Sequence, residues 1–254
     1  MNTGYNFTFI IGYRHRLDRL MNLRRTLDWI NGFSGAQVIL VEQDKYSKIK
    51  SLNLKCQHVF VRTNMPYNRS WAFNVGLKYA KTDIICCGDS DLIMDPQDFI
   101  NGLQATQQYE MVSPYNSVLD LTPQESNMPI EQMIKIQRPG RGENDNQKIN
   151  ISGGIAIFKK EALIKIGGWS ENFIGWGGED DFQTIKVKNF CSWSELKAKV
   201  FHLYHEREQP DPRFYNRTLQ FLQKANTMTK EELAKLINNE MPKMGMKNKY
   251  DNFI

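Results

Sequence analysis

The sequence predicts an α/β fold with a mainly parallel central sheet flanked by helices. Short continuous apolar runs, typical of strands buried on both faces, alternate along the chain with segments of helical periodicity. The 254 residues are 41% hydrophobic and 24% charged, which is the composition of a globular protein and excludes a disordered or fibrous chain. No apolar run approaches the roughly 20 residues that span a bilayer.

The individual elements follow from local signals. Apolar runs predict strands at residues 7–11, 37–41, 58–61, 83–87 and 111–115, and order resumes at 151–158. Helical spacing predicts helices at residues 17–30, 68–80 and 96–107, the last with Asp95 as N-cap and Pro96 at its first position. Thr229 opens a C-terminal helix with a capping box. The polar, proline-containing segment 122–150 is typical of a long loop or insertion.

Charge and cysteine content restrict the setting. The net charge is +5, and residues 186–254, with 13 basic and 8 acidic side chains, supply this excess. Such a surplus fits an anionic ligand, although solvated lysines explain it equally. The four cysteines include the adjacent pair Cys86 and Cys87 and show no zinc-binding spacing, so we expect reduced thiols. Without a secretory signal pattern, we expect a cytoplasmic protein, peripheral at a membrane or in a host cytoplasm if viral, with no evident protein partner.

Two carboxylates follow the strand that ends at Cys87, in the run Gly88-Asp89-Ser90-Asp91. Parallel sheets bind ligands at the carboxyl ends of their strands. Paired carboxylates there can hold a hard divalent cation that bridges to substrate phosphates. Because Asp-x-Asp is also common in turns, this motif alone does not establish a metal site.

The run Gly175-Trp-Gly-Gly-Glu-Asp-Asp181 is a second candidate site. Its three glycines allow unusual backbone angles and close approach to a ligand, and Trp176 offers a flat face that suits a sugar ring. Glu179, Asp180 and Asp181 stand where a helix begins, where carboxylates also favour the helix dipole. Acidic capping alone does not explain the glycines and the tryptophan.

Histidines and arginines supply further candidates. His202 and His205 could share a metal if the chain turns between them, whereas on a regular strand they would face opposite ways. Arg14 and Arg16 follow the first strand and Arg69 follows the third, and arginine forks bind phosphates. For Arg19, Arg24 and Arg25 a solvated helix face is the favoured interpretation.

As an ordered set these motifs resemble beta-1,4-galactosyltransferases and bacterial chondroitin-polymerase-type transferases. The resemblance covers residues 5–217 in patches, and its motifs are Ile10–Arg16, Tyr67–Arg69, Phe73–Gly76, Asp89–Asp91, Ile151–Gly154 and Gly175–Asp181. It implies a GT-A fold and an inverting, metal-dependent transfer of a hexose-type sugar from a nucleotide diphosphate sugar, with UDP as the expected carrier. Residues 1–217 would form the GT-A domain: 1–115 bind the donor, 116–150 are a polar loop or insertion, and 151–217 are the acceptor and catalytic part. Residues 218–254 would be a helical extension.

The resemblance also implies roles for individual residues. Asp180 would be the catalytic base, with Glu179, Asp181 and Trp176 at the acceptor. The metal, Mn²⁺ or alternatively Mg²⁺, would be held by Asp91, His202 and His205; the first histidine departs from the family's usual Met-x-x-His and favours harder ions. The donor-binding residues would be Arg14, Arg16, Arg69, Asp89, Ser90, Trp176 and Gly177.

The expected acceptor is a hydroxyl group of a glycan or glycolipid. One alternative is a hydroxylated base in viral DNA, which would have to be presented out of the stack with contacts to its phosphates. A second alternative, from another class, is a non-catalytic sugar-binding module. The intact set of Asp91, Glu179, Asp180, His202 and His205 argues against it, because binding alone needs no base.

Overall fold

A computed structural model describes residues 1, 4–143, 149–175, 177–206, 209 and 211–249. The strands are β1 (Phe7–Tyr13), β2 (Ala36–Asp44), β3 (Gln57–Arg62), β4 (Ile84–Gly88), β5 (Leu92–Met94), β6 (Met111–Ser113), β7 (Ser117–Asp120), β8 (Ala156–Lys159), β9 (Trp193–Glu195) and β10 (Lys199–His202). The α-helices are α1 (Leu17–Asn31), α2 (Arg69–Leu77), α3 (Pro96–Ala105), α4 (Ile130–Met133), α5 (Lys160–Lys165), α6 (Glu179–Phe190), α7 (Pro212–Asn226) and α8 (Lys230–Glu240). Short 3₁₀ turns are η1 (Lys50–Leu52), η2 (Glu125–Asn127) and η3 (Met241–Lys243).

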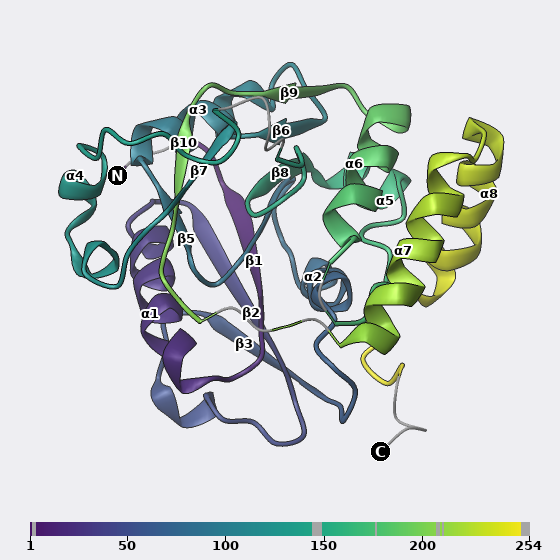
Figure 1. Cartoon of the computed structure of the whole chain (residues 1–254), viewed down its shortest axis with the longest axis horizontal. Coiled ribbons are helices and arrows are strands. Elements are labelled where there is room, and N and C mark those ends of the chain that lie inside the picture. The colour runs from purple at the N-terminus through teal and green to yellow at the C-terminus, as the bar shows by residue number, and fades with distance from the viewer. Residues whose placement is uncertain (2–3, 144–148, 176, 207–208, 210, 250–254) are drawn as a thin grey trace.

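The main sheet has seven strands in the order β3-β2-β1-β4-β8-β6-β9. Its first four strands are parallel, while β8 runs antiparallel to both β4 and β6. Helix α1 covers one face and α2 the other, as Figure 1 shows. The predicted mainly parallel sheet flanked by helices is therefore confirmed, with β8 as the exception to parallel pairing.

The side chains of β1 alternate between the two faces of the sheet, and those on each face pack into a separate hydrophobic core. Phe7, Phe9, Ile11 and Tyr13 pack on the α1 side, whereas Ile10 packs on the α2 side. Helix α2 lies very close to this strand: a Cβ added at Gly12 would stand 2.7 Å from the Ala72 Cβ. This approach places the first turn of α2, which begins at Arg69, against the carboxyl end of β1.

A second, three-stranded sheet joins distant parts of the chain. Strand β10 pairs antiparallel with β5 and parallel with β7. The short strands of this sheet, three or four residues each, are not predicted by the sequence patterns. The expected loop at 122–150 contains η2 and α4, so its described part is more ordered than the polar composition suggests.

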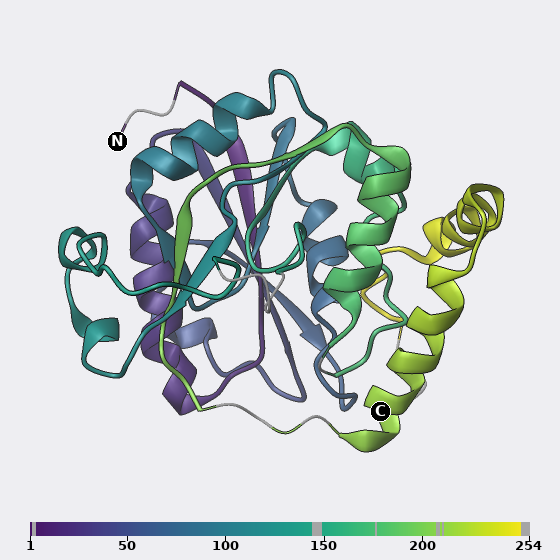
Figure 2. The same ribbon diagram turned by 45° about the horizontal axis from the view of Figure 1, so that its top comes forward.

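The C-terminal helices lie on the α2 side of the molecule, away from α1 (Figure 2). The buried Glu171 carboxylate accepts hydrogen bonds from the Gly245 amide at 2.6 Å and from Lys249 Nζ at 2.7 Å, and one from Asn74 Nδ2 of α2. The C-terminal segment is thus attached to the helix that carries Arg69. The domain division made from the sequence stays a prediction; residue 218, where the extension would begin, lies within α7.

Local predictions at helix ends agree with the structure. Asp95 caps α3 through the Gln97 amide, and Thr229 forms the expected capping box with Glu232. The four cysteines are unpaired; Cys86 and Cys87 are buried, while the other two are partly exposed. None of the helices in the described part of the chain combines the length and apolar composition needed to cross a bilayer.

The aromatic cluster under α1 gives a test of the packing. Phe99 is fully buried, with its ring centroid 5.0–6.2 Å from those of Phe7, Phe9, Trp29 and Phe33. We expect Phe99→Ala to lower the free energy of unfolding by about 3–5 kcal/mol, because it removes these contacts and leaves a cavity. Urea denaturation measures the loss, with Phe99→Leu as the milder control. A loss below about 1 kcal/mol would contradict this packing.

Candidate functional site

The second sheet brings Asp91 next to the histidine pair. Asp91 immediately precedes β5, and Leu92 of that strand is the register partner of His202 at the end of β10. The Leu203 amide then donates to the Asp91 carbonyl at 2.8 Å, so the chain beyond β10 stays beside the aspartate. Because the chain leaves the strand after residue 202, His205 is free to turn back toward the same carboxylate.

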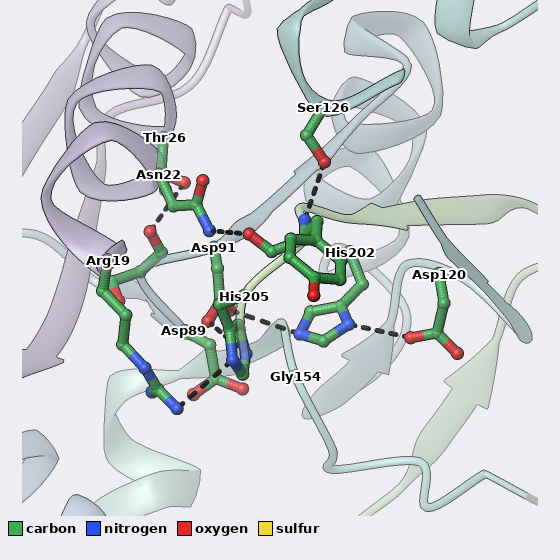
Figure 3. A network of polar contacts seen from close by, with 12 residues as sticks. Arg19, Asn22, Thr26, Asp89, Asp91, Asp120, Ser126, Gly154, His202 and His205 are labelled. Carbon is green, nitrogen blue, oxygen red and sulfur yellow. Dashed lines mark hydrogen bonds and ion pairs between the residues drawn. The ribbon is translucent and has the colours of Figure 1, made fainter. Parts of the chain in front are cut away.

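Asp91, His202 and His205 converge on one point (Figure 3). One His205 nitrogen, Nε2, lies 3.2 Å from Asp91 Oδ2, and His202 Nε2 lies 3.9 Å from Asp91 Oδ1. The three potential ligand atoms all lie within 4.8 Å of one another. One carboxylate oxygen and two imidazole nitrogens form a donor set that fits a divalent metal ion. These are the three residues that the sequence predicts as metal ligands.

The other ring nitrogens of both histidines face acceptors. His202 Nδ1 lies 2.8 Å from Asp120 Oδ1, and His205 Nδ1 lies 2.9 Å from the Glu206 carbonyl oxygen. Since an ionised carboxylate can only accept, His202 Nδ1 carries the proton and donates to Asp120, which leaves the Nε2 lone pair of the neutral ring on the side of Asp91. Both nitrogens of His205 face acceptors, so its Nε2 donates to Asp91, and a metal ion bound there would take the place of that proton.

The electrostatics of this cluster favour an ionised Asp91. Burial opposes ionisation, but the hydrogen bond from His205 and the charges of both histidines lower the pKa of Asp91. The same hydrogen bond raises the pKa of His205. Asp120, hydrogen-bonded to His202 and Arg141, has a pKa well below its usual range.

Arg69 is the centre of an adjacent carboxylate cluster. The Arg69 side chain is 8% exposed, and its Nε donates to Asp89 Oδ1 while its Nη1 donates to Asp180 Oδ1, both at 2.5 Å. The third nitrogen, Nη2, donates to the Gly154 carbonyl at 3.1 Å, and Glu179 Oε1 lies 3.9 Å from Nη1. The predicted donor-binding arginine therefore contacts both the Asp-x-Asp motif and the predicted catalytic base.

Burial changes the protonation of these acids. It raises the pKa of Glu179 to about 7, helped by the neighbouring charge of Asp180. It also raises the pKa of Asp180 and brings that of Asp89 to about 6, in both cases against the opposing charge of Arg69. Glu179 Oε2 is buried without a hydrogen-bond partner among the described residues. Asp181, by contrast, accepts from Asn150 Nδ2 at an exposed position.

The glycine run before α6 has the unusual backbone that the sequence predicts. Gly175, Gly177 and Gly178 have φ values of +85°, +98° and +86°, a region that side chains with a Cβ rarely adopt. Gly178 is the N-cap of α6, so this loop leads directly to Glu179 and Asp180. Trp176, the predicted sugar platform, lies outside the described residues.

The remaining predicted donor-site residues have protein partners. Arg14 donates to the carbonyl oxygens of Gln43 at 2.9 Å and Met65 at 2.7 Å, and Arg16 pairs with Asp18 at 3.0 Å on the surface. The buried Ser90 carbonyl accepts from the Thr26 hydroxyl at 3.1 Å. Thus Arg14 supports the loop after β3, and Ser90 fixes the metal-site motif to α1.

Two residues at the site were not found by the sequence analysis. Arg19, assigned to a solvated helix face, instead turns toward the cluster: its Nη2 lies 3.4 Å from His205 Nδ1, and its buried Nε has no partner among the described residues. Its position in the first turn after β1, at the ligand-binding edge of the sheet, was an available signal. Asp120 ends a four-residue strand that no periodicity reveals.

Comparison with known proteins identifies the family of this chain. Residues 26–167, more than half of the chain, match glycosyl transferase family 2. The chain belongs to this family. Residues 144–206 of this glycosyltransferase also match the N-terminal domain of galactosyltransferase. Mouse beta-1,4-galactosyltransferase 4 is 42% identical over 36 residues, 14% of this chain and only about a tenth of that protein.

Solved structures agree on the fold. The catalytic domain of Drosophila beta1,4-galactosyltransferase 7 with xylobiose has a TM-score of 0.56 and 16% identity, covering 89% of this chain and 82% of that one. A variant of it with manganese, UDP-Gal and xylobiose has a TM-score of 0.52 and 15% identity over 84% and 74% of the two chains. S. aureus TarS 1–349 with UDP-GlcNAc has a TM-score of 0.59 and 14% identity over 98% and 76%. The chain is thus a member of glycosyl transferase family 2 with the GT-A fold, and it resembles galactosyltransferases.

The raised pKa of Glu179 predicts a pH effect on stability. A buried carboxyl whose pKa rises from 4.5 to about 7 binds more protons in the folded than in the unfolded state, so it stabilises the fold at low pH and this contribution is lost as the pH rises through 7. The free energy of unfolding lost in this way approaches about 3 kcal/mol. We expect Glu179→Gln to remove this pH dependence between pH 4.5 and 7.5, measured by urea denaturation. Parallel pH profiles of wild type and variant would contradict the assignment.

Proposed function

We propose that this glycosyltransferase is metal-dependent and inverting, and that it transfers a hexose-type sugar from a UDP-sugar to a hydroxyl group of a glycan or glycolipid. The observation that supports this best is the pair of contacts of Arg69. They join Asp180, a candidate base, to Asp89, which stands two residues before the candidate metal ligand Asp91. The two groups that such a transfer needs therefore share one site. Relatives with the same fold are known with manganese and UDP-Gal, or with UDP-GlcNAc.

Asp91, His202 and His205 would hold the metal, with Mn²⁺ preferred and Mg²⁺ as the alternative. When bound, the ion supplies positive charge that neutralises the diphosphate leaving group. The residues themselves place one carboxylate and two imidazole nitrogens at a common point. Arg19 adds a permanent positive charge beside His205, where it suits the same diphosphate.

The donor would lie at the carboxyl edge of β1 and β4. We assign Asp89 to the ribose, and Arg14 and Arg16, which follow β1, to the nucleotide. Ser90, Gly177 and Trp176 complete the proposed donor site, the last also facing the acceptor. The guanidinium of Arg69 is already bonded to two carboxylates. In this proposal Arg69 therefore serves the donor site by fixing Asp89 in place, in addition to any contact with the nucleotide.

Asp180 is the proposed general base. Its ion pair with Arg69 opposes the effect of burial and favours the ionised carboxylate. That carboxylate takes the proton of the acceptor hydroxyl while the hydroxyl oxygen attacks C1 of the sugar from the face opposite the diphosphate. A single displacement of this kind inverts the anomeric centre. Glu179 and Asp181, its neighbours on α6, would hold the acceptor.

Family membership favours an enzyme over the non-catalytic sugar-binding module considered from the sequence. A hydroxylated base in DNA stays the alternative acceptor to a glycan or glycolipid. Transfer to such a base would decline steeply with salt, because the basic residues of the C-terminal third would have to contact phosphates.

The base assignment predicts the effect of Asp180→Asn. We expect turnover to fall by about 10²–10⁴-fold, because the amide keeps the contact with Arg69 but cannot accept the proton. Donor affinity should be unchanged, since Asp180 acts on the acceptor. Steady-state transfer and donor binding are measured together, with Glu161→Gln, an exposed acid on α5, as the control. Normal turnover in the Asp180 variant would refute its role as base.

The donor and metal assignments predict a coupled thermal shift. A UDP-sugar at about 100 times its dissociation constant should stabilise the fold by about 2.7 kcal/mol in the presence of Mn²⁺. We expect little effect without the ion and none in Asp91→Asn, which has lost a ligand. Equal stabilisation with and without Mn²⁺, or in that variant, would contradict a donor site built around the metal.

A further inference from the structure

Strand β7 ends in a carboxylate placed directly beside one candidate metal ligand. Asp120 and His202 are register partners at the ends of the parallel strands β7 and β10. Asp120 Oδ1 lies 2.8 Å from His202 Nδ1, the ring nitrogen that faces away from Asp91 (Figure 3). The carboxylate therefore contacts the imidazole on the side opposite the proposed metal.

The polar segment after β7 returns to hold this carboxylate. Arg141 binds it with both arms of its guanidinium, Nε to Oδ2 at 2.8 Å and Nη2 to Oδ1 at 3.1 Å. Arg141 is itself fixed by a bridge to Val118, through main-chain hydrogen bonds of 2.8 and 2.9 Å. Arg138 Nη2 donates to the Asp120 carbonyl at 2.6 Å. The side chain and the main chain of Asp120 are thus both held from residues 138–141.

A carboxylate in this position has defined effects on an imidazole. By accepting the Nδ1 proton it selects the tautomer whose lone pair is on Nε2, and it fixes the plane of the ring. It also makes Nε2 a stronger donor to a metal, because the carboxylate stabilises positive charge on the ring. Each effect favours binding of an ion at the point where His202 and Asp91 converge.

We propose that Asp120, held by Arg141, is a positioning residue for the metal site and sets its affinity through His202. This inference rests on the proposed role of Asp91, His202 and His205 as metal ligands. It gives a function to the segment that the sequence identifies only as a polar loop or insertion: residues 138–141 complete the outer part of the metal site.

The test is titration of the full chain with Mn²⁺, followed by the electron paramagnetic resonance signal of the free ion. Asp120→Ala should weaken Mn²⁺ binding by about 10–100-fold, and Asp120→Asn by less, because its amide oxygen still accepts from Nδ1. The melting temperature without metal is recorded for each variant, so that a loss of folding is separated from a loss of affinity. Unchanged affinity in a folded Asp120→Ala protein would overturn the proposal.

Glu131→Gln is the matched control. Glu131 is an exposed acid on helix α4, in the same polar segment as Arg138 and Arg141. We expect its Mn²⁺ affinity to stay within twofold of wild type. An equal loss in the control would mean that Asp120 acts only through the general order of the segment, which overturns the proposal.

A double variant tests whether Asp120 affects Mn²⁺ affinity through His202. If Asp120 acts through that imidazole, the double variant Asp120→Ala/His202→Ala should bind Mn²⁺ no more weakly than His202→Ala alone. If the two substitutions instead lower Mn²⁺ affinity by factors that multiply in the double variant, the proposal would be overturned.

Failure of the metal site itself would look different. Should wild type bind no Mn²⁺, or Asp91→Asn bind it as well as wild type, the proposed ligand set would be wrong and this inference would fall with it. Loss of affinity in the Asp91 and His202 variants without loss in Asp120→Ala would overturn only the present inference.

Discussion

The buried guanidinium of Arg69 is the interaction on which the rest of the site depends. Three acids, Asp89, Asp180 and Glu179, lie around it with their side chains 14–35% exposed, so that solvent screens their repulsion only in part. A partly buried cluster of three carboxylates is unfavourable without a paired cation. Arg69 can reach all three because the close packing of α2 on β1, where Gly12 leaves no room for a side chain, brings the start of the helix to the edge of the sheet.

The small second sheet brings together polar groups that are far apart in the sequence. Strands β7 and β10 end with Asp120 and His202, and Asp91 immediately precedes β5. The main sheet fixes Asp89 through β4, and the short turn 89–91 connects the two clusters. A site assembled from two sheets in this way separates the groups proposed to bind the donor's diphosphate from those proposed to take the acceptor's proton.

Much of this was predictable from the sequence, for identifiable reasons. Long buried strands such as β1 and β2, and helices with strong caps such as α3 and α8, carry local signals that tertiary contacts do not override. The convergence of Asp91, His202 and His205 was expected from the resemblance to beta-1,4-galactosyltransferases, since the residues alone left the histidine pair open. Strands of three or four residues carry no periodicity, so Asp120 was missed. Arg19 was misassigned because a helical pattern does not show which arginine faces a site, and the main-chain partners of Arg14 depend on folding of the loop after β3.

Anomalous diffraction from a crystal grown with Mn²⁺ and UDP would test the central claim, that one site holds the donor's metal beside the base. We predict a single strong manganese peak within about 2.0–2.3 Å of Asp91 and of the Nε2 atoms of His202 and His205, with the diphosphate between it and Arg19. Asp180 should remain paired with Arg69 and face the end of the diphosphate. A manganese peak away from these three residues, or a diphosphate on the far side of Arg69 from Asp180, would contradict it.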